Sequence, residues 1–293
     1  MIWNLIYGLH PMLAVGLILF VALAVGLVIR KLIGRTFSPS ERHAHNELLG
    51  HAAGITGVIN AVLLAFIVYA AWTGYDRARD VVSEEVSLLN DIWRDAEAAS
   101  SAHDSLVSEL QSYLVTVIDT EWPYMQHGMF SERQAAGGFG TGWRTLSRAY
   151  TLSLNLEAGN ALQKTVAEEL VKRFNSLFDA RRQRIASSTQ GALTSTVWGV
   201  VLAGGLVSII CCGLFGFESR RLHTVSVMLV ALSFGLVFYL IISLQWPFRG
   251  QNQISAEPYC AAWNNLIRLE SREAAERGIP WVAPSKPVHC LTR

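Results

Sequence analysis

Residues 48–72 read LLGHAAGITGVINAVLLAFIVYAAW, an apolar run of 25 residues without a single Lys, Arg, Asp or Glu. A helix of this length crosses the hydrocarbon core of a bilayer, which is roughly 30 Å thick. The chain then continues without proline as far as Pro123, and only Gly74 offers a break. We therefore predict a single helix of about 75 residues, from about His45 to Trp122, which leaves the lipid and continues in water.

A stripe of mostly apolar side chains continues beyond this run at a spacing of three or four residues, as in the seam of a coiled coil or helical hairpin. The charged opposite side is expected to face water. A second amphipathic helix is expected from about Asn155 to Ser187, returning along the first as an antiparallel hairpin with one short extra helix. Pro123 is expected to end the first helix. The stripe consists of Val82, Val86, Leu89, Trp93, Ala96, Ser100, His103, Val107, Leu110, Leu114 and Val117, and the charged side of Glu84, Glu85, Asp91, Arg94, Asp95 and Glu97.

The composition is that of a membrane protein. Hydrophobic residues make up 51% of the chain and charged residues only 16%, against roughly 25% charged in soluble domains. The formal net charge of +1 gives no indication of a nucleic-acid partner. Four apolar runs predict an all-α membrane protein with four transmembrane helices and a long helical hairpin that extends from the second and third. The expected parts are a first membrane helix within 1–30, a basic loop 31–47, a second membrane helix 48–73, an extramembrane helical domain 74–192, membrane helices 193–217 and 224–245, and an extramembrane tail 246–293.

Lys and Arg set the expected orientation in a bacterial inner membrane. By the positive-inside rule, the loop after the first span and the loop between the last two spans are cytoplasmic, and the N-terminus, the helical domain and the tail are periplasmic. No Lys or Arg precedes the first apolar run, so we expect no cleavable signal peptide. The two loops carry Arg30, Lys31, Arg35, Arg42, Arg220 and Arg221, whereas Arg77, Arg79, Arg181, Arg182 and Arg184 favour the opposite orientation.

Two faces of the run 48–72 are informative. A stripe of small residues allows helices to approach closely in lipid and predicts a homo-oligomer. Thr56 and Asn60 lie together on another face, and a polar side chain near mid-membrane, such as that of Asn60, faces a bundle interior or water. They line a permeation path with the apolar Ile59 and Leu63, or they form an interhelical hydrogen bond, and both alternatives remain open. The stripe is Gly50, Gly54, Gly57, Ala61 and Ala65.

The cysteines predict one covalent link. Cys260 and Cys290 fall on the same side of the membrane in any four-span topology, so a disulfide can form if that side is periplasmic. It would close a loop of about 30 residues and contribute about 3–4 kcal/mol in the chain-entropy model. Cys211 and Cys212 lie within a span and are expected to be inert.

A metal site is a weaker expectation. His43, Glu47 and His51 are four residues apart, so a continuous helix would stack them on one face, and two His with a carboxylate can bind a divalent metal. The alternative is a polar collar at the membrane interface.

Nothing in the sequence indicates an enzyme. No Ser/His/Asp or Cys/His arrangement is apparent, and no carboxylate pair lies within a span, which also disfavours a proton-coupled transporter. The run Gly137–Gly142 loosely resembles a phosphate-binding loop, but no Lys-Ser/Thr follows it and no βαβ pattern surrounds it, so we expect a flexible turn and no cofactor.

Several short motifs form a recognisable set. They are His45-Asn46, the stretch Asn60 to Phe66, Trp72 and Tyr75, then Glu121-Trp-Pro123, then Trp198 with Gly204, and finally Pro247-Phe248-x-Gly250 with Ser255 and Pro258-Tyr259. Together they resemble the core signature of the bestrophin-like domain family, a group of membrane proteins of bacteria and plants. The similarity covers about 45–260.

The resemblance implies kinship with bestrophins, pentameric anion channels whose second membrane helix lines the pore and continues into a helical cytosolic domain. Two features depart from bestrophins: the charge bias places the helical domain outside the cytoplasm, and the aromatic neck of the pore corresponds here to Ile55, Ile59, Leu63 and Phe66. We expect an oligomeric channel, pentameric by resemblance, for an anion such as chloride. The rival expectation is a non-conducting scaffold or sensor whose helical domain binds a partner. The candidate pore-lining residues are Thr56, Ile59, Asn60, Leu63 and Phe66.

Overall fold

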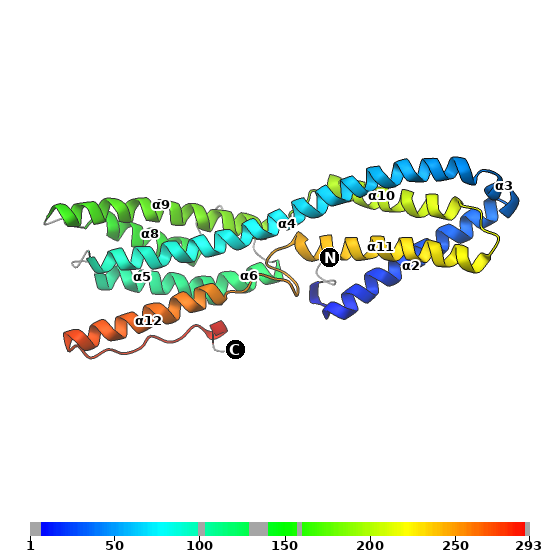
Figure 1. Cartoon of the computed structure of the whole chain (residues 1–293). Coiled ribbons are helices and arrows are strands. Elements are labelled where there is room, and N and C mark those ends of the chain that lie inside the picture. Colours follow the sequence, from blue (N-terminus) through cyan, green and yellow to red (C-terminus); the bar gives the residue numbers. More distant parts are fainter. Residues whose placement is uncertain (1–6, 99–102, 129–139, 157–159, 291–293) are drawn as a thin grey trace. The chain divides into compact units, whose positions relative to one another are not determined.

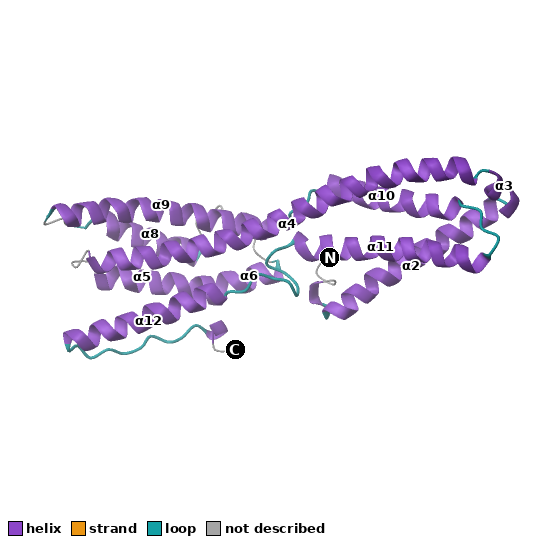
Figure 2. Cartoon of the chain, in the orientation of Figure 1, coloured by secondary structure: helices purple, strands orange, loops and turns teal. Residues whose placement is uncertain are grey.

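A computed structural model describes residues 7–98, 103–128, 140–156 and 160–290 (Figure 1). Within these ranges the chain forms helices, turns and loops and no strand (Figure 2). The chain divides into two compact units. Unit 1 comprises residues 1–75, 191–246 and 250–252, and unit 2 comprises 76–190, 247–249 and 253–293.

Unit 1 contains the apolar helices. They are α2 (Pro11–Thr36), the first part of α4 (Asn46–Ala98), α10 (Ser195–Leu214) and α11 (Arg220–Gln245), with the short α3 (Pro39–Ala44) between α2 and α4. Each of the four long helices is apolar enough over a sufficient length to cross a membrane. The prediction of an all-helical protein with four helices that could span a membrane is therefore confirmed for the described residues.

The first span is longer than its apolar run. Pro11 occupies its first turn, where the missing N–H has no partner to lose. The helix continues to Thr36, so that Arg30, Lys31 and Arg35 are helical and do not lie in a loop. The connection to α4 is consequently short and is itself mostly helical.

Glycines allow the apolar helices of unit 1 to pack closely. A Cβ on Gly26 of α2 would lie 3.1 Å from the Ala231 Cβ of α11, and a Cβ on Gly235 of α11 would lie 3.1 Å from the Ala22 Cβ of α2. A Cβ on Gly213 of α10 would lie 2.8 Å from Ile33 Cδ1. These crossings use small residues as membrane helices commonly do.

A buried amide joins the start of α10 to the end of α11. Gln245 accepts from Leu193 N at Oε1, at 3.1 Å, and donates from Nε2 to Leu193 O at 3.0 Å. The same turn is reinforced by Ala192 N, which donates to Gln245 O at 2.9 Å. Backbone groups near lipid need hydrogen-bond partners within the protein. Gln245 supplies such partners to the N–H and C=O of Leu193, just before α10.

The helix α4 is continuous through Gly74 and runs from Asn46 to Ala98. This confirms that the apolar run and a charged amphipathic segment share one helix. Its extension to Trp122 is wrong, since Tyr113 of α5 (His103–Thr116) donates to Glu85 Oε1 at 2.6 Å. A straight helix would separate these residues by about 42 Å, so the chain reverses, and α5 returns beside α4 (Figure 1).

Pro123 does not end a helix. A π-helical turn, η1 (Val117–Glu121), follows α5, and α6 (Trp122–His127) continues from it with Pro123 in its first turn. A proline there costs no helical hydrogen bond. The segment ends at Gly128, whose φ of 67° is left-handed and suits glycine.

Unit 2 is a bundle of several helices and not the two-helix hairpin expected. Besides the second part of α4, α5, η1 and α6, it contains α8 (Thr141–Leu154), α9 (Ala161–Thr189), α12 (Glu257–Arg277) and the 3₁₀ turn η2 (Val288–Cys290). The helix predicted from Asn155 begins later, at Ala161, where Asn160 caps it by accepting from Gln163 N. The helix α12 ends at Gly278, whose φ of 67° is left-handed. Of the glycine run, residues 137–139 lie outside the described residues.

The predicted seam forms much of the core of unit 2. Its apolar members are buried on both sides of the reversal, on α4 and on α5, except Val86, which is half-buried, and Ser100 lies outside the described residues. The buried members are Val82, Leu89, Trp93, Ala96, Val107, Leu110, Leu114 and Val117.

Candidate functional site

The part of α4 that belongs to unit 1 has an open apolar face. Ile55 and Phe66 are about two-thirds exposed, at 66% and 67%, and Ile59 is 54% exposed. With Val62 they follow a spacing of four, three and four residues, which places all four on one line along the helix. Leu63 borders the line. None of the described helices covers the open face.

The small-residue stripe lies on a different side of α4 from the open face, and two of its members, Gly57 and Ala61, border a cavity between α4, α10 and α11. Cβ atoms built on Gly50, Gly54 and Gly57 would meet nothing within 4 Å. This contrasts with Gly26, Gly213 and Gly235, which lie against neighbouring helices of the same chain. The stripe predicted for helix packing is thus unused within one chain.

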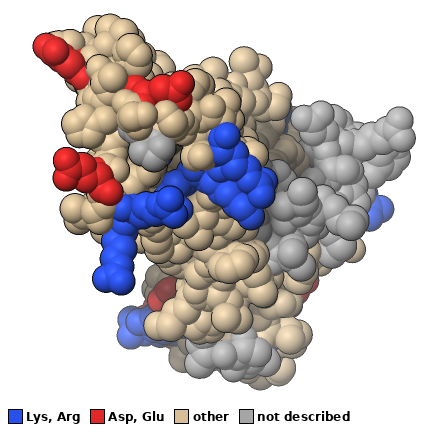
Figure 3. Space-filling model, turned by 90° about the vertical axis from the view of Figure 1, so that its right-hand side faces the viewer, with Lys and Arg blue, Asp and Glu red and all other residues tan. Residues whose placement is uncertain are grey.

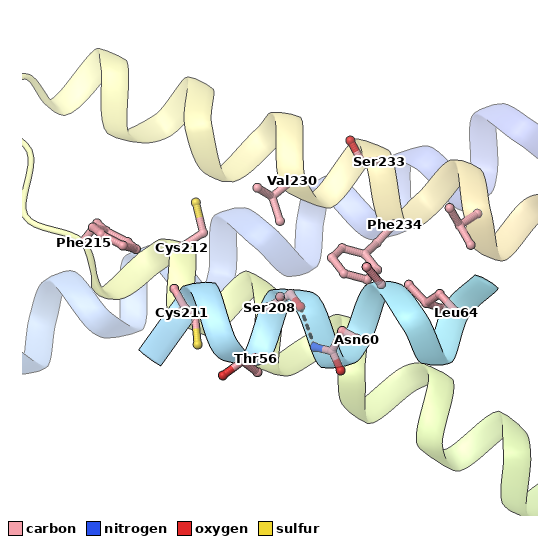
Figure 4. A pocket seen from close by; sticks show the side chains of 14 residues that line it. Thr56, Asn60, Leu64, Ser208, Cys211, Cys212, Phe215, Val230, Ser233 and Phe234 are labelled. Atoms are coloured by element: carbon pink, nitrogen blue, oxygen red, sulfur yellow. Dashed lines mark hydrogen bonds between the residues drawn. The ribbon is translucent and has the colours of Figure 1, made fainter. Parts of the chain in front are cut away.

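Asn60 points away from the open face. It is 8% exposed and donates from Nδ2 to Gly204 O at 3.0 Å and to Ser208 Oγ at 2.9 Å, both on α10 (Figure 4). The Cβ that any other residue would place at Gly204 lies 2.9 Å from Asn60 Oδ1, so glycine makes room for this amide. The neighbouring Thr56 donates to Ala52 O of its own helix at 2.7 Å. Of the two alternatives for Asn60, the structure therefore forms the interhelical hydrogen bonds.

A cavity of about 400 Å³ lies behind α4, between α4, α10 and α11 (Figure 4). Thr56, Asn60, Ser208 and Ser233 contribute its few polar groups, and the rest of its lining is mainly apolar. The half-buried thiols of Cys211 and Cys212 also line it, and neither forms a disulfide. Pockets that combine an apolar lining with few polar groups suit lipid-like or small organic molecules.

A second amide anchors the start of α4. Asn46 donates from Nδ2 to Gly216 O and accepts at Oδ1 from Gly216 N, both at 2.8 Å. Asn46 and Asn60 are about four turns apart on the same side of α4. Two side-chain amides thus hold this helix against α10 and the loop that follows it.

The predicted stacking of His43, Glu47 and His51 does not occur. The helix is interrupted at His45, so His43 lies on α3 while Glu47 and His51 lie on α4. In the part of the chain that the structure describes, no three His, Cys, Asp or Glu side chains come together to hold a metal ion.

Unit 2 contains buried ionised side chains that the sequence analysis missed. Arg184 of α9 donates from Nε to Glu85 Oε2 and from Nη2 to Glu121 Oε2, each at 2.7 Å. Arg181, one turn earlier, pairs with the other oxygen of Glu121. None of the four side chains is more than 5% exposed. The two arginines balance the two glutamates, and the cluster joins α4, η1 and α9.

Charge complementarity keeps this cluster ionised. Burial alone would raise the pKa of Glu121, but Arg184 and Arg181 outweigh burial and hold this pKa below its usual range. Burial would similarly lower the pKa of Arg184, and Glu85 with its neighbours raises it well above its usual value instead. The Tyr113 hydroxyl completes the shell around Glu85, and its own pKa is raised by burial and by Glu85.

The prediction that Glu85 lies on a solvated charged face is wrong. Its neighbour Glu84 is exposed as expected, whereas Glu85 is 0% exposed. The one signal available in the sequence was its position, one turn after Val81 and Val82 and one turn before Leu89, which places it on the apolar stripe.

The C-terminal segment is attached to unit 2 at two places. Cys260 of α12 and Cys290 of η2 form a disulfide with a Cα–Cα distance of 5.7 Å, the pairing considered from the sequence. Asp119 of η1 accepts from Val288 N at 3.0 Å and from His289 N at 3.1 Å. The π-helical turn thus directs Asp119 to the C-terminal segment and Glu121 to the buried arginines.

Comparison with known proteins identifies relatives of this fold. A family model described as Bestrophin-like domain matches residues 16–259, and no curated protein matches. A bacterial bestrophin homologue from Klebsiella pneumoniae, phased on zinc, is 13% identical over 87% of this chain and 98% of its own, with a TM-score of 0.62. An aspartate-to-alanine variant of a bestrophin homologue from that organism is 15% identical over 86% of this chain and 97% of its own, with a TM-score of 0.60. A structure described as that of a membrane protein is 14% identical over 87% of this chain and 98% of its own, with a TM-score of 0.61. At these identities the likeness shows a shared fold.

Proposed function

The chain belongs to the Bestrophin-like domain family, and from this membership we propose that it is an oligomeric ion channel in which α4 lines the pore. The protein is an integral membrane protein, with four helices that can span a bilayer. An ion path through such a protein requires a helix face that several copies turn toward a common axis.

The observation that carries this proposal is the open face of α4 together with its unused small-residue stripe. Exposed apolar residues alone do not distinguish a pore from a lipid-facing surface, because α2 and α11 also expose them. Isolated glycines without a neighbour within 4 Å also occur on α2 and α10, but α4 has three of them at a spacing of four and three residues, and such rows of small residues allow membrane helices to approach closely. In the proposed assembly a second copy of the chain packs against Gly50 and Gly54, and the open face of α4, on another side of the helix, is turned toward the axis.

The pore constriction in this proposal is apolar. Ile59, Leu63 and Phe66 line it, Thr56 lies at its edge, and Asn60 supports it from behind by holding α4 against α10. A ring of apolar side chains gates a pore by dewetting. Following the resemblance to bestrophins, we assign an anion such as chloride as the permeating ion and five as the subunit number.

Purified protein in planar bilayers tests the proposal. We expect a chloride current, and we expect Ile59→Thr to raise the open fraction because a hydroxyl helps water to enter the constriction. The matched control is Leu229→Thr, which makes a similar apolar-to-polar change at an exposed position of α11 and should leave the current unchanged.

Each alternative predicts a different recording. If neither the native protein nor Ile59→Thr carries current at any potential, the protein is the non-conducting scaffold. A current carried by sodium, established by reversal potentials, would retain the pore and reject the assignment of the anion.

A further inference from the structure

The end of unit 1 at which α3 lies gathers cationic side chains from three helices. Arg30 near the end of α2 donates from Nη2 to Arg220 O at 3.4 Å, and Arg42 of α3 donates from Nη1 to Gly213 O at 3.5 Å. His223 lies in the first turn of α11, close enough to both arginines for their charges to act on its ring. Figure 3 faces this end and shows Lys and Arg side chains gathered there.

These cationic groups lack adequate partners. Arg30 Nε, Arg42 Nε and His223 Nε2 are buried without a hydrogen-bond partner. The two guanidinium bonds given above are at the long limit for hydrogen bonds. Among the described residues, neither Arg30 nor Arg42 forms an ion pair with a carboxylate. Arg30 and Arg42 are half-buried, and burying part of a cationic group without a counter-charge is unfavourable, so an anion beside the two guanidinium groups would stabilise them.

The start of α11 adds positive potential. Its first turn contains Arg220, Arg221 and His223 and no acidic residue, and a helix N-terminus is itself electropositive. His223 is fixed in place, being 5% exposed and stacked on Phe217 with ring centroids 5.4 Å apart. A nearby carboxylate, that of Glu41, is occupied by the N–H and hydroxyl of Ser38 at 2.7 Å each.

We propose that Arg30, Arg42 and the first turn of α11 bind the phosphate of an anionic phospholipid headgroup. The guanidinium fork of arginine matches phosphate oxygens in geometry and charge. The cluster lies at the ends of membrane-spanning helices, the level at which headgroups lie. The exposed Phe217 and Leu222 beside it offer apolar contacts to the rest of the lipid. The site is independent of the pore and of its ion.

Native mass spectrometry of the full chain in detergent, titrated with phosphatidylglycerol or phosphatidylcholine, tests the site. We expect the native protein to retain phosphatidylglycerol preferentially. Arg30→Gln with Arg42→Gln should weaken this binding about tenfold or more, as the loss of charge-assisted bonds to phosphate predicts. The matched control, Lys31→Gln with Arg35→Gln, removes the same charge from exposed positions of α2 and should change binding by less than about twofold.

Further measurements separate a headgroup site from other causes. Arg30→Lys with Arg42→Lys retains the charge and is expected to give an intermediate loss, and it replaces the glutamine variant if that variant does not fold. Equal losses in the control pair would indicate diffuse charge and overturn the proposal, as would a native protein without lipid preference. Displacement of phosphatidylglycerol by millimolar inorganic phosphate would reject a lipid in favour of the free anion.

Discussion

Arg184 is the residue on which the interior of unit 2 depends most directly. It binds two carboxylates from different elements, and its guanidinium lies 5.8 Å from the centre of the Tyr259 ring. Arg184→Met would leave Glu85 buried without its cation, and removing one member of a buried pair costs about 3–5 kcal/mol. Urea or thermal unfolding in detergent measures the loss.

A control for this prediction lies two residues before Arg184. Arg182 is also ion-paired, to Asp179, but both side chains are about 60% exposed. Arg182→Met should therefore cost at most about 1 kcal/mol. Similar losses for the two variants would mean that burial of the cluster contributes little to stability.

The buried cluster also predicts a dependence of stability on pH. The folded-state pKa of Glu121 is lowered from its ordinary value of 4.5 by Arg184 and Arg181, against the opposing effect of burial. The stabilisation is therefore complete above pH 4.5 and is lost as the pH falls through the lowered pKa. The contribution of Glu121 to the unfolding free energy should be constant between about pH 8 and pH 5 and should fall in more acidic solution. Glu121→Gln should flatten this acid limb, and an unchanged limb would contradict the assignment.

Residues whose partners are distant in sequence are the ones that the sequence analysis missed. Glu85 and Glu84 are chemically identical neighbours, and the partner of Glu85 is 99 residues away. Local periodicity can place Glu85 on the buried side of a helix but cannot supply a buried arginine to justify the placement. Asn60 was identified as important because a polar side chain in a span is conspicuous, and the structure adds that its amide bonds to α10.

At the scale of the helix, the glycines of α4 lead us to predict that copies of the chain associate through this helix. Gly57→Leu introduces a side chain where nothing lies within 4 Å, so the protomer should fold normally while close approach of a second copy is blocked. Light scattering in detergent should show a smaller assembly with an unchanged melting temperature.

The matched control for Gly57→Leu is Gly205→Leu on α10. A Cβ there would lie 2.7 Å from Phe238 Cζ of α11, so this variant should lower the melting temperature of the protomer itself. If Gly57→Leu leaves the mass of the assembly unchanged, the small-residue stripe is not part of the oligomer interface.

Element boundaries follow from the sequence where a single physical signal dominates. The four apolar helices are predicted because lipid imposes a minimum apolar length, and in α12 Pro258 lies in the first turn and Gly278 follows the last residue, as helix-end signals in a sequence indicate. The reversal after Ala98 was missed because the apolar stripe keeps its spacing on both sides of it. The π-helical turn before α6 was missed because a proline after a helical pattern usually indicates the end of the helix. Here the π-helical turn precedes Pro123, and Pro123 lies in the first turn of α6.

At the scale of the whole molecule, the number of spans ties several segments to one side of the membrane. Residues 76–190 follow the apolar part of α4 and precede α10, and residues 253–290 follow α11. Two helices that can span a membrane, α10 and α11, separate these segments, so we expect both segments on the same side. The disulfide between Cys260 and Cys290 belongs to this side, and such bonds persist in oxidising compartments.

We therefore expect unit 2 to be periplasmic. The positive-inside rule applies to short connections, and the arginines of 76–190 count little because that segment far exceeds the roughly 60 residues over which the rule holds. The short connections carry Arg42 and, at the start of α11, Arg220 and Arg221. An alkaline-phosphatase fusion at residue 140 should be active and one at residue 218 inactive, while Cys260 and Cys290 should resist thiol labelling in intact membranes until reduced. The reverse fusion activities, with both thiols free, would place unit 2 in the cytoplasm.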